Sequence, residues 1–309
     1  MSSLAHDQSK FLNLSNPLYR QSVIQYTEFE IKKDLGKFGD ITTKAFFKRP
    51  LKACAKIIAK QKGILAGVNE IEYFLGRRKI SVKFLKRDGD AVKNGDEICN
   101  LYGDIKDILK LERASLNLLG RMSGVASKTA RIVAKIRKIN KKIIVAPTRK
   151  TLWGLLDKRA CAIGGGGTHR LGLYDAILIK DNHLDAIGRN IPLAIRHFFP
   201  YKGPAKFIEI EVENEAEAIL AVREFKRLKD SKLCRIPCFI MFDNMHPKKI
   251  RRAIDVLVKL GLREVCGFEA SGGITEKNVL AYAKTGVDVI SMGCLTHGAF
   301  SLDFSLEME

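Results

Sequence analysis

Short apolar runs alternate with longer amphipathic stretches along the second half of this chain. We interpret the runs as strands and the stretches between them as helices. Repeated strand–helix units imply a parallel sheet with helices outside it. Six units are too few for a regular eight-stranded barrel and predict a shortened or open one. The predicted strands are residues 142–146, 176–179, 207–212, 238–242, 264–268 and 287–291, and the helices between them include 215–228, 247–259 and 275–284.

The first part of the chain has a different pattern, in which turn residues separate short β-like stretches. Two Gly-Asp pairs, Gly89-Asp90 and Gly95-Asp96, mark turns that flank short strands. Residues 1 to about 110 therefore predict an α+β domain. The expected elements are a helix at 18–34, a turn-rich segment at 34–43 and β-like stretches at 51–66 and 79–86.

A long helical pattern connects the two parts. From Asp104 to about residue 139 the apolar positions fall at helical spacing, and Gly120 and Gly124 are expected to interrupt or bend this helix. Residues 1–16 are polar, and we predict that they are loosely ordered.

Composition restricts the class of protein. A chain of 309 residues with 46% hydrophobic content can bury a substantial core, and it contains no apolar run long enough to span a membrane. The N-terminus lacks the layout of a signal peptide, and the seven cysteines are scattered, so we expect a cytoplasmic protein with reduced thiols. The pair Cys234 and Cys238 has no matching second pair, which makes a zinc site improbable.

The net charge of +20 is compatible with nucleic acid, a membrane surface or anionic substrates as partners. The Lys and Arg residues are spread along the chain and no nucleic-acid recognition motif is present, so we rank nucleic-acid binding low. A concentrated basic cluster favours a small, multiply anionic ligand, because like charges seldom gather without an anion among them. The alternative is a solvated basic face. The cluster consists of Arg149, Lys150, His169, Arg170, Lys180 and His183 around the glycines 164–167.

Polar and charged residues also follow each predicted strand. Because the C-terminal ends of parallel strands meet at one edge, we expect these groups to form one site. The groups are Thr148, Arg149 and Lys150; Lys180, Asp181, Asn182 and His183; Asp243 and Asn244; Glu269, Ser271, Gly272 and Gly273; and Gly293, followed by Thr296 and His297.

Three carboxylates alternate along the third predicted strand. Glu209, Glu211 and Glu213 would share one face, which we expect to point into the barrel; the alternative is that this face meets solvent. The turn Ser271-Gly-Gly273 leads into a predicted helix, and its exposed amides together with Gly293 would suit a phosphate group. Such a site fits a phosphorylated sugar and a second, carboxylate-bearing substrate.

A series of motifs covers nearly the whole chain. They are Asp34-Leu-Gly36, Gly39-Asp-Ile-Thr-Thr43, Glu112-Arg113, Leu116-Asn117, Ser123-Gly124, Thr148-Arg-Lys-Thr151, Gly164-Gly-Gly166, His169-Arg170, Ile179-Lys-Asp-Asn-His183, Glu209-Ile-Glu-Val-Glu-Asn214, Asp243-Asn-Met245, Glu269-Ala-Ser-Gly-Gly273 and Gly293-Cys-Leu-Thr-His297. In this order and spacing the set resembles the quinolinate phosphoribosyltransferases, also called nicotinate-nucleotide pyrophosphorylases (carboxylating).

The resemblance implies an α/β fold with an N-terminal α/β sandwich and an open, TIM-like α/β barrel of about six parallel strands. The sandwich would comprise residues 1–112, joined by 296–309, and the barrel residues 113–295. The family further implies a homodimer in which Arg113 reaches into the partner's active site.

The resemblance also implies roles for individual residues. Arg113, Thr148, Arg149, His169, Arg170 and Lys180 would bind quinolinate, and Lys150, Glu211, Asp243, Ser271, Gly272, Gly293 and His297 would contact phosphoribosyl pyrophosphate. Glu211 and Asp243 would also hold Mg²⁺, directly or through water. Lys150, Lys180, Glu211 and Asp243 are the expected catalytic residues.

The implied activity is decarboxylating phosphoribosyl transfer to quinolinate in NAD biosynthesis. Trp153 and a shortened segment before the glycines depart from the family pattern, as does Thr168 before His169-Arg170. These differences are either harmless loop variation or the mark of a paralogue that acts on another aromatic acid. A basic nucleic-acid-binding protein without this activity is the third possibility.

Overall fold

The computed structural model describes residues 3–199 and 203–309, which divide into two compact units. The barrel unit contains the described residues up to 8, residues 132–150 and the described residues of 166–294, and the sandwich unit contains residues 9–131, 151–165 and 295–309. This division differs from the one expected at residues 112 and 295. Residues 113–131 and 151–165 belong to the sandwich unit, and the N-terminal segment belongs to the barrel unit.

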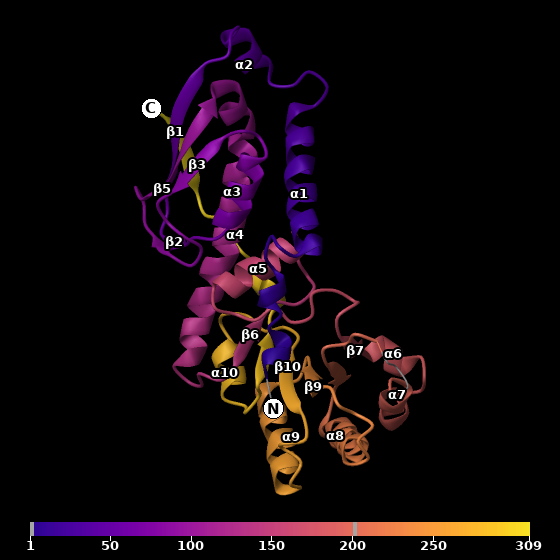
Figure 1. The fold of residues 1–309 in the computed structure, drawn as a ribbon. Helices are drawn as coiled ribbons and strands as arrows, with labels where there is room; N and C mark the ends of the chain where they lie inside the picture. Colours follow the sequence, from indigo (N-terminus) through magenta and orange to yellow (C-terminus); the bar gives the residue numbers. More distant parts are fainter. Residues whose placement is uncertain (1–2, 200–202) are drawn as a thin grey trace. The chain divides into compact units, whose positions relative to one another are not determined.

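The barrel unit is built on a parallel sheet of six strands in the order β6-β11-β10-β9-β8-β7. Because β6 and β7 stand at the two ends of this order, the predicted open barrel is confirmed. Helices α8 (Glu215–Asp230) and α9 (Pro247–Lys259) flank the sheet (Figure 1). The strands are β6 (Ile144–Ala146), β7 (Ile177–Ile179), β8 (Ile208–Val212), β9 (Cys238–Asp243), β10 (Gly267–Ser271) and β11 (Val289–Ser291).

Two predicted elements of the barrel unit depart from their expected bounds by three residues or more. The fifth strand was expected at 264–268 but runs from Gly267, because the residues before it form turns that close α9. Leu262 N–H donates to Leu257 O, and Val265 N–H donates to Leu262 O. Helix α10 (Val279–Ala283) is shorter than the expected 275–284, since the Asn278 side chain accepts from the Thr275 amide and holds a turn there. The remaining helices of this unit are α6 (Asp181–Asp185) and α7 (Ile191–His197).

The sandwich unit contains an antiparallel sheet in the order β12-β1-β5-β3 and a short pair, β2-β4. The last strand therefore pairs with the first one, and Phe304 lies opposite Ala59. The strands are β1 (Lys52–Ala59), β2 (Gly63–Ile64), β3 (Ser81–Phe84), β4 (Ala91–Val92), β5 (Glu97–Asp104) and β12 (Phe304–Met308), and the helices are α1 (Pro17–Leu35), α2 (Ile41–Phe46), α3 (Val68–Gly76) and α5 (Leu155–Ile163).

The long helix α4 (Ile105–Arg137) is continuous over 33 residues, so the expected interruption at its glycines was wrong. Gly120 and Gly124 instead permit a close backbone approach. A Cβ on Gly124 would lie 1.8 Å from the Phe300 carbonyl oxygen, and one on Gly120 would lie 2.6 Å from that of Leu302. The Leu302 amide donates to the Gly120 carbonyl at 2.9 Å, which fixes the C-terminal segment against the helix.

The prediction of a loosely ordered N-terminus was also wrong for the residues that the structure describes. The segment forms two 3₁₀ helices, η1 (Ser3–His6) and η2 (Ser9–Phe11), and Asn16 caps α1. His6 and Leu12 are fully buried. Over the described part of the chain, no helix has the length and apolar character needed to cross a lipid bilayer.

Candidate active site

The C-terminal ends of the barrel strands place several predicted site residues at one edge of the sheet. The parallel register puts Ser271 beside Asp243 and places Glu211 and Asp243 at the ends of neighbouring strands. Lys180 directly follows β7, and Thr148 follows β6. The strand-end groups from β6 to β10 therefore share one edge, as the alternating pattern of the sequence predicted.

A Lys–Glu pair occupies this edge. The Lys180 Nζ lies 3.0 Å from Glu211 Oε1, and the Asp181 amide donates to Glu211 Oε2 at 3.0 Å. Burial raises the pKa of Glu211, while the Asp181 amide and the Lys180 ammonium oppose that rise. Because the Lys180 side chain remains 42% exposed, its ammonium can reach a ligand while it is paired with Glu211.

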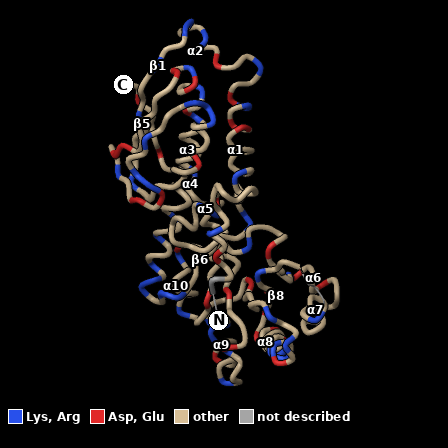
Figure 2. The backbone as a smooth tube through the Cα atoms, in the orientation of Figure 1, with Lys and Arg blue, Asp and Glu red and all other residues tan. Residues whose placement is uncertain are grey.

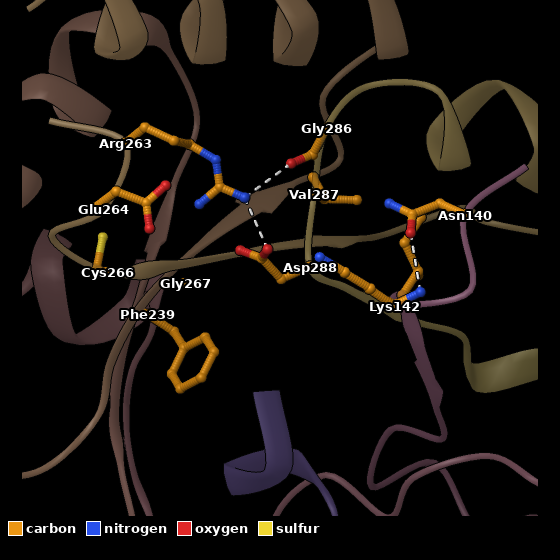
Figure 3. A pocket seen from close by; sticks show the side chains of 11 residues that line it. Asn140, Lys142, Phe239, Arg263, Glu264, Cys266, Gly267, Gly286, Val287 and Asp288 are labelled. Carbon is orange, nitrogen blue, oxygen red and sulfur yellow. Dashed lines mark hydrogen bonds and ion pairs between the residues drawn. The ribbon is translucent and has the colours of Figure 1, made fainter. Parts of the chain in front are cut away.

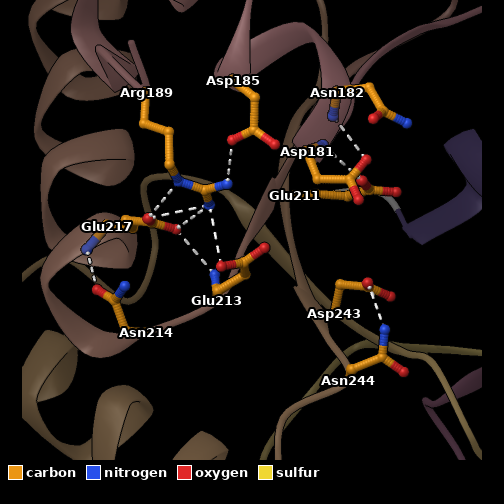
Figure 4. A network of polar contacts seen from close by, with 10 residues as sticks. All are labelled: Asp181, Asn182, Asp185, Arg189, Glu211, Glu213, Asn214, Glu217, Asp243 and Asn244. Carbon is orange, nitrogen blue, oxygen red and sulfur yellow. Dashed lines mark hydrogen bonds and ion pairs between the residues drawn. The ribbon is translucent and has the colours of Figure 1, made fainter.

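Asp243 and Ser271 end two adjacent strands and border a tight backbone turn. Asp243 Oδ2 accepts from the Asn244 side chain at 2.7 Å, and the Asn244 amide donates to the Ser271 carbonyl at 3.0 Å. Asn244 and Gly272 both have positive φ angles, and a Cβ on Gly272 would lie 2.3 Å from the Asn244 side-chain oxygen. Only glycine fits at position 272 without displacing Asn244. Figure 4 shows Glu211 and Asp243 on neighbouring strands.

The cations of the cluster differ in exposure. Arg149 and Lys150 are exposed, whereas Arg170 is only 4% exposed. Burial and the nearby Arg149 guanidinium both lower the pKa of Arg170. The guanidinium groups of Arg149 and Arg170 repel one another, and Arg170 is also buried. This arrangement favours a bound anion, because an anion offsets both the repulsion and the cost of desolvation.

Of the three alternating carboxylates, two behave as predicted. Glu209 and Glu211 are buried within β8. Glu213 lies beyond the end of the strand and is exposed, so its expected inward orientation was wrong. It pairs instead with Arg189, which also contacts Glu217 and Asp185 in the polar network of Figure 4.

His169 is part of a buried group that the sequence did not reveal. Its Nε2 lies 3.4 Å from Glu209 Oε2 and 3.3 Å from Glu269 Oε1. The fourth member is His6, whose Nε2 lies 3.0 Å from Glu269 Oε2. No motif pointed to His6; the only available signal was that an inward Glu209 needs a partner.

Glu269 was expected at a strand end but lies in the middle of β10. The remaining cluster member, His183, is exposed, and its Nδ1 accepts from the Lys180 amide at 2.9 Å.

Three further residues singled out from the sequence belong to the sandwich unit. The Arg113 side chain is 62% exposed, and His297 is exposed. Trp153 packs against Tyr26 of α1, with the ring centroids 4.0 Å apart. Arg113 and Trp153 line a groove of about 310 Å³ within this unit, together with Leu116, Asn117, Gly120 and residues 301–304.

A cavity of about 260 Å³ lies at the opposite end of the barrel sheet, where the strands begin (Figure 3). Arg263 crosses it and pairs with Asp288 at 2.7 Å, and Asp288 in turn accepts from the Phe268 amide at 2.8 Å. These contacts hold the start of β10, and none of the predicted site residues lines the cavity. The cavity is therefore separate from the strand-end site.

Fold and strand-end groups together define a class: an α/β-barrel enzyme that acts on a multiply anionic substrate. The models of the quinolinate phosphoribosyl transferase N-terminal and C-terminal domains match residues 40–123 and 125–307. The chain belongs to the quinolinate phosphoribosyl transferase family.

Several known proteins are similar over most of their length. A probable nicotinate-nucleotide pyrophosphorylase (carboxylating) of Methanothermobacter thermautotrophicus is 40% identical, with 90% of this chain and 96% of that protein covered. The corresponding protein of Bacillus subtilis is 37% identical, with 89% and 90% covered. The crystal structure of NadC from Streptococcus pyogenes is 30% identical with a TM-score of 0.80, covering 94% of this chain and 97% of that one.

Proposed function

We propose that this chain catalyses decarboxylating phosphoribosyl transfer from phosphoribosyl pyrophosphate to quinolinate. The products are nicotinate mononucleotide, pyrophosphate and CO2, which makes the enzyme a pentosyltransferase of NAD biosynthesis. The observation that carries this proposal is the proximity of two unlike groups within the barrel unit. Arg170 and Arg149 supply buried and exposed guanidinium groups, and Glu211 and Asp243 supply carboxylates.

The guanidinium groups suit the acceptor substrate. Arginine binds planar carboxylates through paired hydrogen bonds, and quinolinate carries two carboxylates on one ring. We assign Arg149, Arg170 and Thr148 to quinolinate binding, with Arg113 of a second subunit as an additional contact. His169, whose two ring nitrogens contact the Arg170 amide and the carboxylates of Glu209 and Glu269, would act through Arg170. The exposed Arg113 side chain supports that homodimeric arrangement, since it is available to another molecule.

The carboxylates suit the sugar. When the pyridine nitrogen attacks C1 of the ribose, the bond from C1 to the pyrophosphate oxygen breaks, and positive charge develops on the sugar. Glu211 and Asp243 would stabilise this charge and accept hydrogen bonds from the ribose hydroxyls. Ser271, Gly272 and Gly293 would bind the phosphate groups with backbone amides, and Lys150 and His297 would contact the pyrophosphate.

Decarboxylation follows from the charge on the ring. Once the nitrogen is quaternised, the bond from C2 to its carboxylate breaks, CO2 leaves, and the electron pair remains on C2 until this carbon takes up a proton. Lys180 would position the departing carboxylate, because its ammonium remains partly exposed beside Glu211.

The donor set of the strand ends fits Mg²⁺, which prefers carboxylate oxygens. Both Glu211 oxygens are engaged by Lys180 and Asp181, whereas Asp243 accepts one bond from the Asn244 side chain. Asp243 is therefore the better candidate for direct contact, and Glu211 for contact through water. The bound ion would neutralise charge on the leaving pyrophosphate.

The test is an assay that contains quinolinate, phosphoribosyl pyrophosphate and Mg²⁺ and measures both nicotinate mononucleotide and CO2. Equal amounts of the two products are expected. Nicotinate in place of quinolinate serves as the control, because its transfer releases no CO2. A product formed only with another aromatic acid would identify the chain as a paralogue and overturn the proposed substrate.

The nucleic-acid alternative gains no support from the charge distribution. Figure 2 shows Lys and Arg spread over both units rather than gathered on one segment.

A further inference from the structure

We propose that the segment Ser3–Gln8 plugs the interior of the barrel unit and that His6 is a positioning residue for the substrate-binding Arg170. The inference rests on the proposed function, because it concerns the residue assigned to quinolinate. It extends beyond the family resemblance, since the family models match the chain only from residue 40 onward.

The plug is held to the chain just before Arg170 by backbone hydrogen bonds. The His6 carbonyl accepts from the amides of Thr168 at 2.9 Å and His169 at 2.8 Å. The Gln8 amide donates to Thr168 Oγ1 at 2.8 Å. Gly167 provides the space for this contact, because a Cβ there would lie 2.7 Å from the His6 carbonyl oxygen.

The His6 side chain enters the interior between aromatic rings. It stacks on Phe207 with a centroid distance of 4.4 Å and meets Phe239 edge-on at 4.3 Å. Phe207 and Phe239 belong to the apolar cluster at the strand starts, against which Ala5 of the plug also packs. An imidazole at this depth, with no exposed surface, requires polar partners.

Those partners are the two inward carboxylates. His6 Nε2 lies 3.0 Å from Glu269 Oε2 and 3.6 Å from Glu209 Oε1, and His169 contacts the other oxygen of each carboxylate. Apart from these imidazole contacts, the carboxylate oxygens have no hydrogen-bond partner among the described residues. Each imidazole therefore bridges Glu209 and Glu269, and removing one would leave two buried carboxylates facing a single donor.

The hydrogen bonding favours this bridge over a bound metal ion, although the four ligand atoms lie within 4.8 Å of one another. His169 Nδ1 accepts from the Arg170 amide at 2.7 Å, so its lone pair is used there and the proton of the neutral ring sits on Nε2. A protonated Nε2 donates to carboxylates and cannot ligate a metal. Metal-bound histidines normally donate from their second nitrogen, whereas this one accepts.

The hydrogen bond from the Arg170 amide to His169 Nδ1 connects His6 to the substrate-binding residue. His169 has a positive φ of 52°, and it joins the plug through its amide to Arg170 through its ring. His6 thus fixes the carboxylates, the carboxylates fix the His169 ring, and the ring fixes the Arg170 backbone. Glu209 and Arg170 also interact electrostatically, so the charge that His6 compensates is part of the environment of Arg170.

The experiment compares His6→Leu with His6→Gln. Leucine fills similar space without a donor, whereas the glutamine amide can donate to both carboxylates. We expect His6→Leu to raise the KM for quinolinate about tenfold while the KM for phosphoribosyl pyrophosphate changes less than about twofold. His6→Gln should restore most of the loss. His197→Leu, at an exposed histidine of the same unit, is the matched control and should change neither KM.

A second readout does not depend on activity. In ¹⁵N-labelled protein, the His169 ring nitrogens should show a protonated Nε2 and an unprotonated Nδ1, and His6→Leu should shift both resonances. If His6→Leu fails to fold, His6→Asn replaces it, since its shorter amide withdraws the donor from the carboxylates.

The possible failures are distinct. A wild-type protein without turnover on quinolinate would refute the proposed function. Normal turnover with unchanged KM values and unchanged His169 resonances in His6→Leu would overturn the role of His6. A rise in both KM values together with a fall in kcat would indicate that the plug is merely structural. One equivalent of transition metal that is present in the wild type and absent from His6→Leu would establish a metal centre instead.

Discussion

The Lys180 ammonium and the Glu211 carboxylate lie 3.0 Å apart at the C-terminal ends of adjacent strands. The pair joins the group assigned to the departing carboxylate of quinolinate to the group assigned to the ribose. A change in the charge of one substrate therefore alters the electrostatic potential at the residue assigned to the other, because the two side chains form one partly buried ion pair.

Replacing either of two cations should abolish turnover without unfolding the protein. Lys180→Ala and Arg149→Ala are expected to lower kcat/KM for quinolinate on the order of a thousandfold, because each removes a carboxylate contact assigned to catalysis or binding. Circular dichroism and the melting temperature should stay close to wild type. Lys249→Ala, at an exposed lysine on α9, is the control. Normal steady-state rates in the first two variants would refute the assignment.

The proposed homodimer, in which Arg113 reaches the partner's site, predicts complementation. Arg113→Ala and Lys180→Ala should each be inactive as pure preparations. If Arg113 acts on the partner's site, a hybrid dimer has one site with both residues intact, so an equal mixture should recover about a quarter of wild-type activity after subunit exchange. No recovery from a mixture that size-exclusion chromatography shows to contain hybrids would place Arg113 in its own subunit's site or in none.

The buried imidazole predicts a loss of stability at alkaline pH. Burial lowers the pKa of His6, but Glu209 and Glu269 raise it more, from 6.5 to about 9. The pKa of His6 in the folded protein lies above its value in the unfolded chain. Protonated His6 therefore stabilises the fold fully below pH 6.5, and this stabilisation is lost as the pH rises to about 9. The titratable groups that face His6 are Glu209, Glu269 and His169.

Urea unfolding between pH 6 and 10 measures this effect. The free energy of unfolding should fall by up to about 3 kcal/mol across the window. His6→Leu should be less stable at pH 6 and should show a flatter profile than wild type. An identical slope in both proteins would mean that another group is responsible.

The close contact at Gly124 predicts a strong effect of a single methyl group. Gly124→Ala places a Cβ 1.8 Å from the Phe300 carbonyl oxygen, so the C-terminal segment must move. We expect the free energy of unfolding to fall by about 3 kcal/mol. Gly76→Ala, at a helical glycine whose Cβ would meet nothing within 4 Å, should change it by less than about 0.5 kcal/mol. Equal effects would show that helix propensity matters here rather than the contact.

A buried ion pair in the sandwich unit predicts that losing one partner costs more than losing both. Arg121 donates from Nε and Nη2 to the two oxygens of Asp157 at 2.9 Å each, and Asp157 also accepts from the amides of Leu152 and Trp153. Asp157→Ala leaves the buried Arg121 guanidinium without its carboxylate partner and should lower the free energy of unfolding by about 3–5 kcal/mol. The double variant Arg121→Met with Asp157→Leu should lose less, because no unpaired charge remains. Thermal unfolding of both variants measures the difference.

Local pattern was sufficient for the six strands of the barrel unit and for helices α8, α9 and α10, but not for all of their bounds. The strand β8 was predicted at 207–212 and runs over Ile208–Val212, because its alternation is strong and its flanks are polar. The shift of β10 arose because Val265 and Cys266 are as apolar as strand residues, whereas the Val265 amide closes a turn by donating to the Leu262 carbonyl. Apolar residues indicate contact with the core but not the type of element, so an apolar turn has the same sequence pattern as a short strand.

No comparable pattern in the sequence predicted which distant segments of the chain pack together. Helix propensity alone predicts that Gly120 and Gly124 interrupt or bend α4. The helix is continuous, and the two glycines make room for residues 300–302. The last strand completes the first sheet, as the family resemblance implied for residues 296–309 but no local pattern did. The polar composition of residues 1–16 gave no sign of a buried His6.

By itself, the sequence determined the parallel strand–helix order and the chemistry of the strand ends. Both follow from short-range periodicity and from the geometric rule that parallel strands present their C-terminal ends together. Only the tertiary structure decided which partners the inward carboxylates have, since Gln8 and Thr168 meet across 160 positions. Contacts of that separation depend on how the whole chain closes, and a buried charge accepts whichever donor the closed chain brings to it.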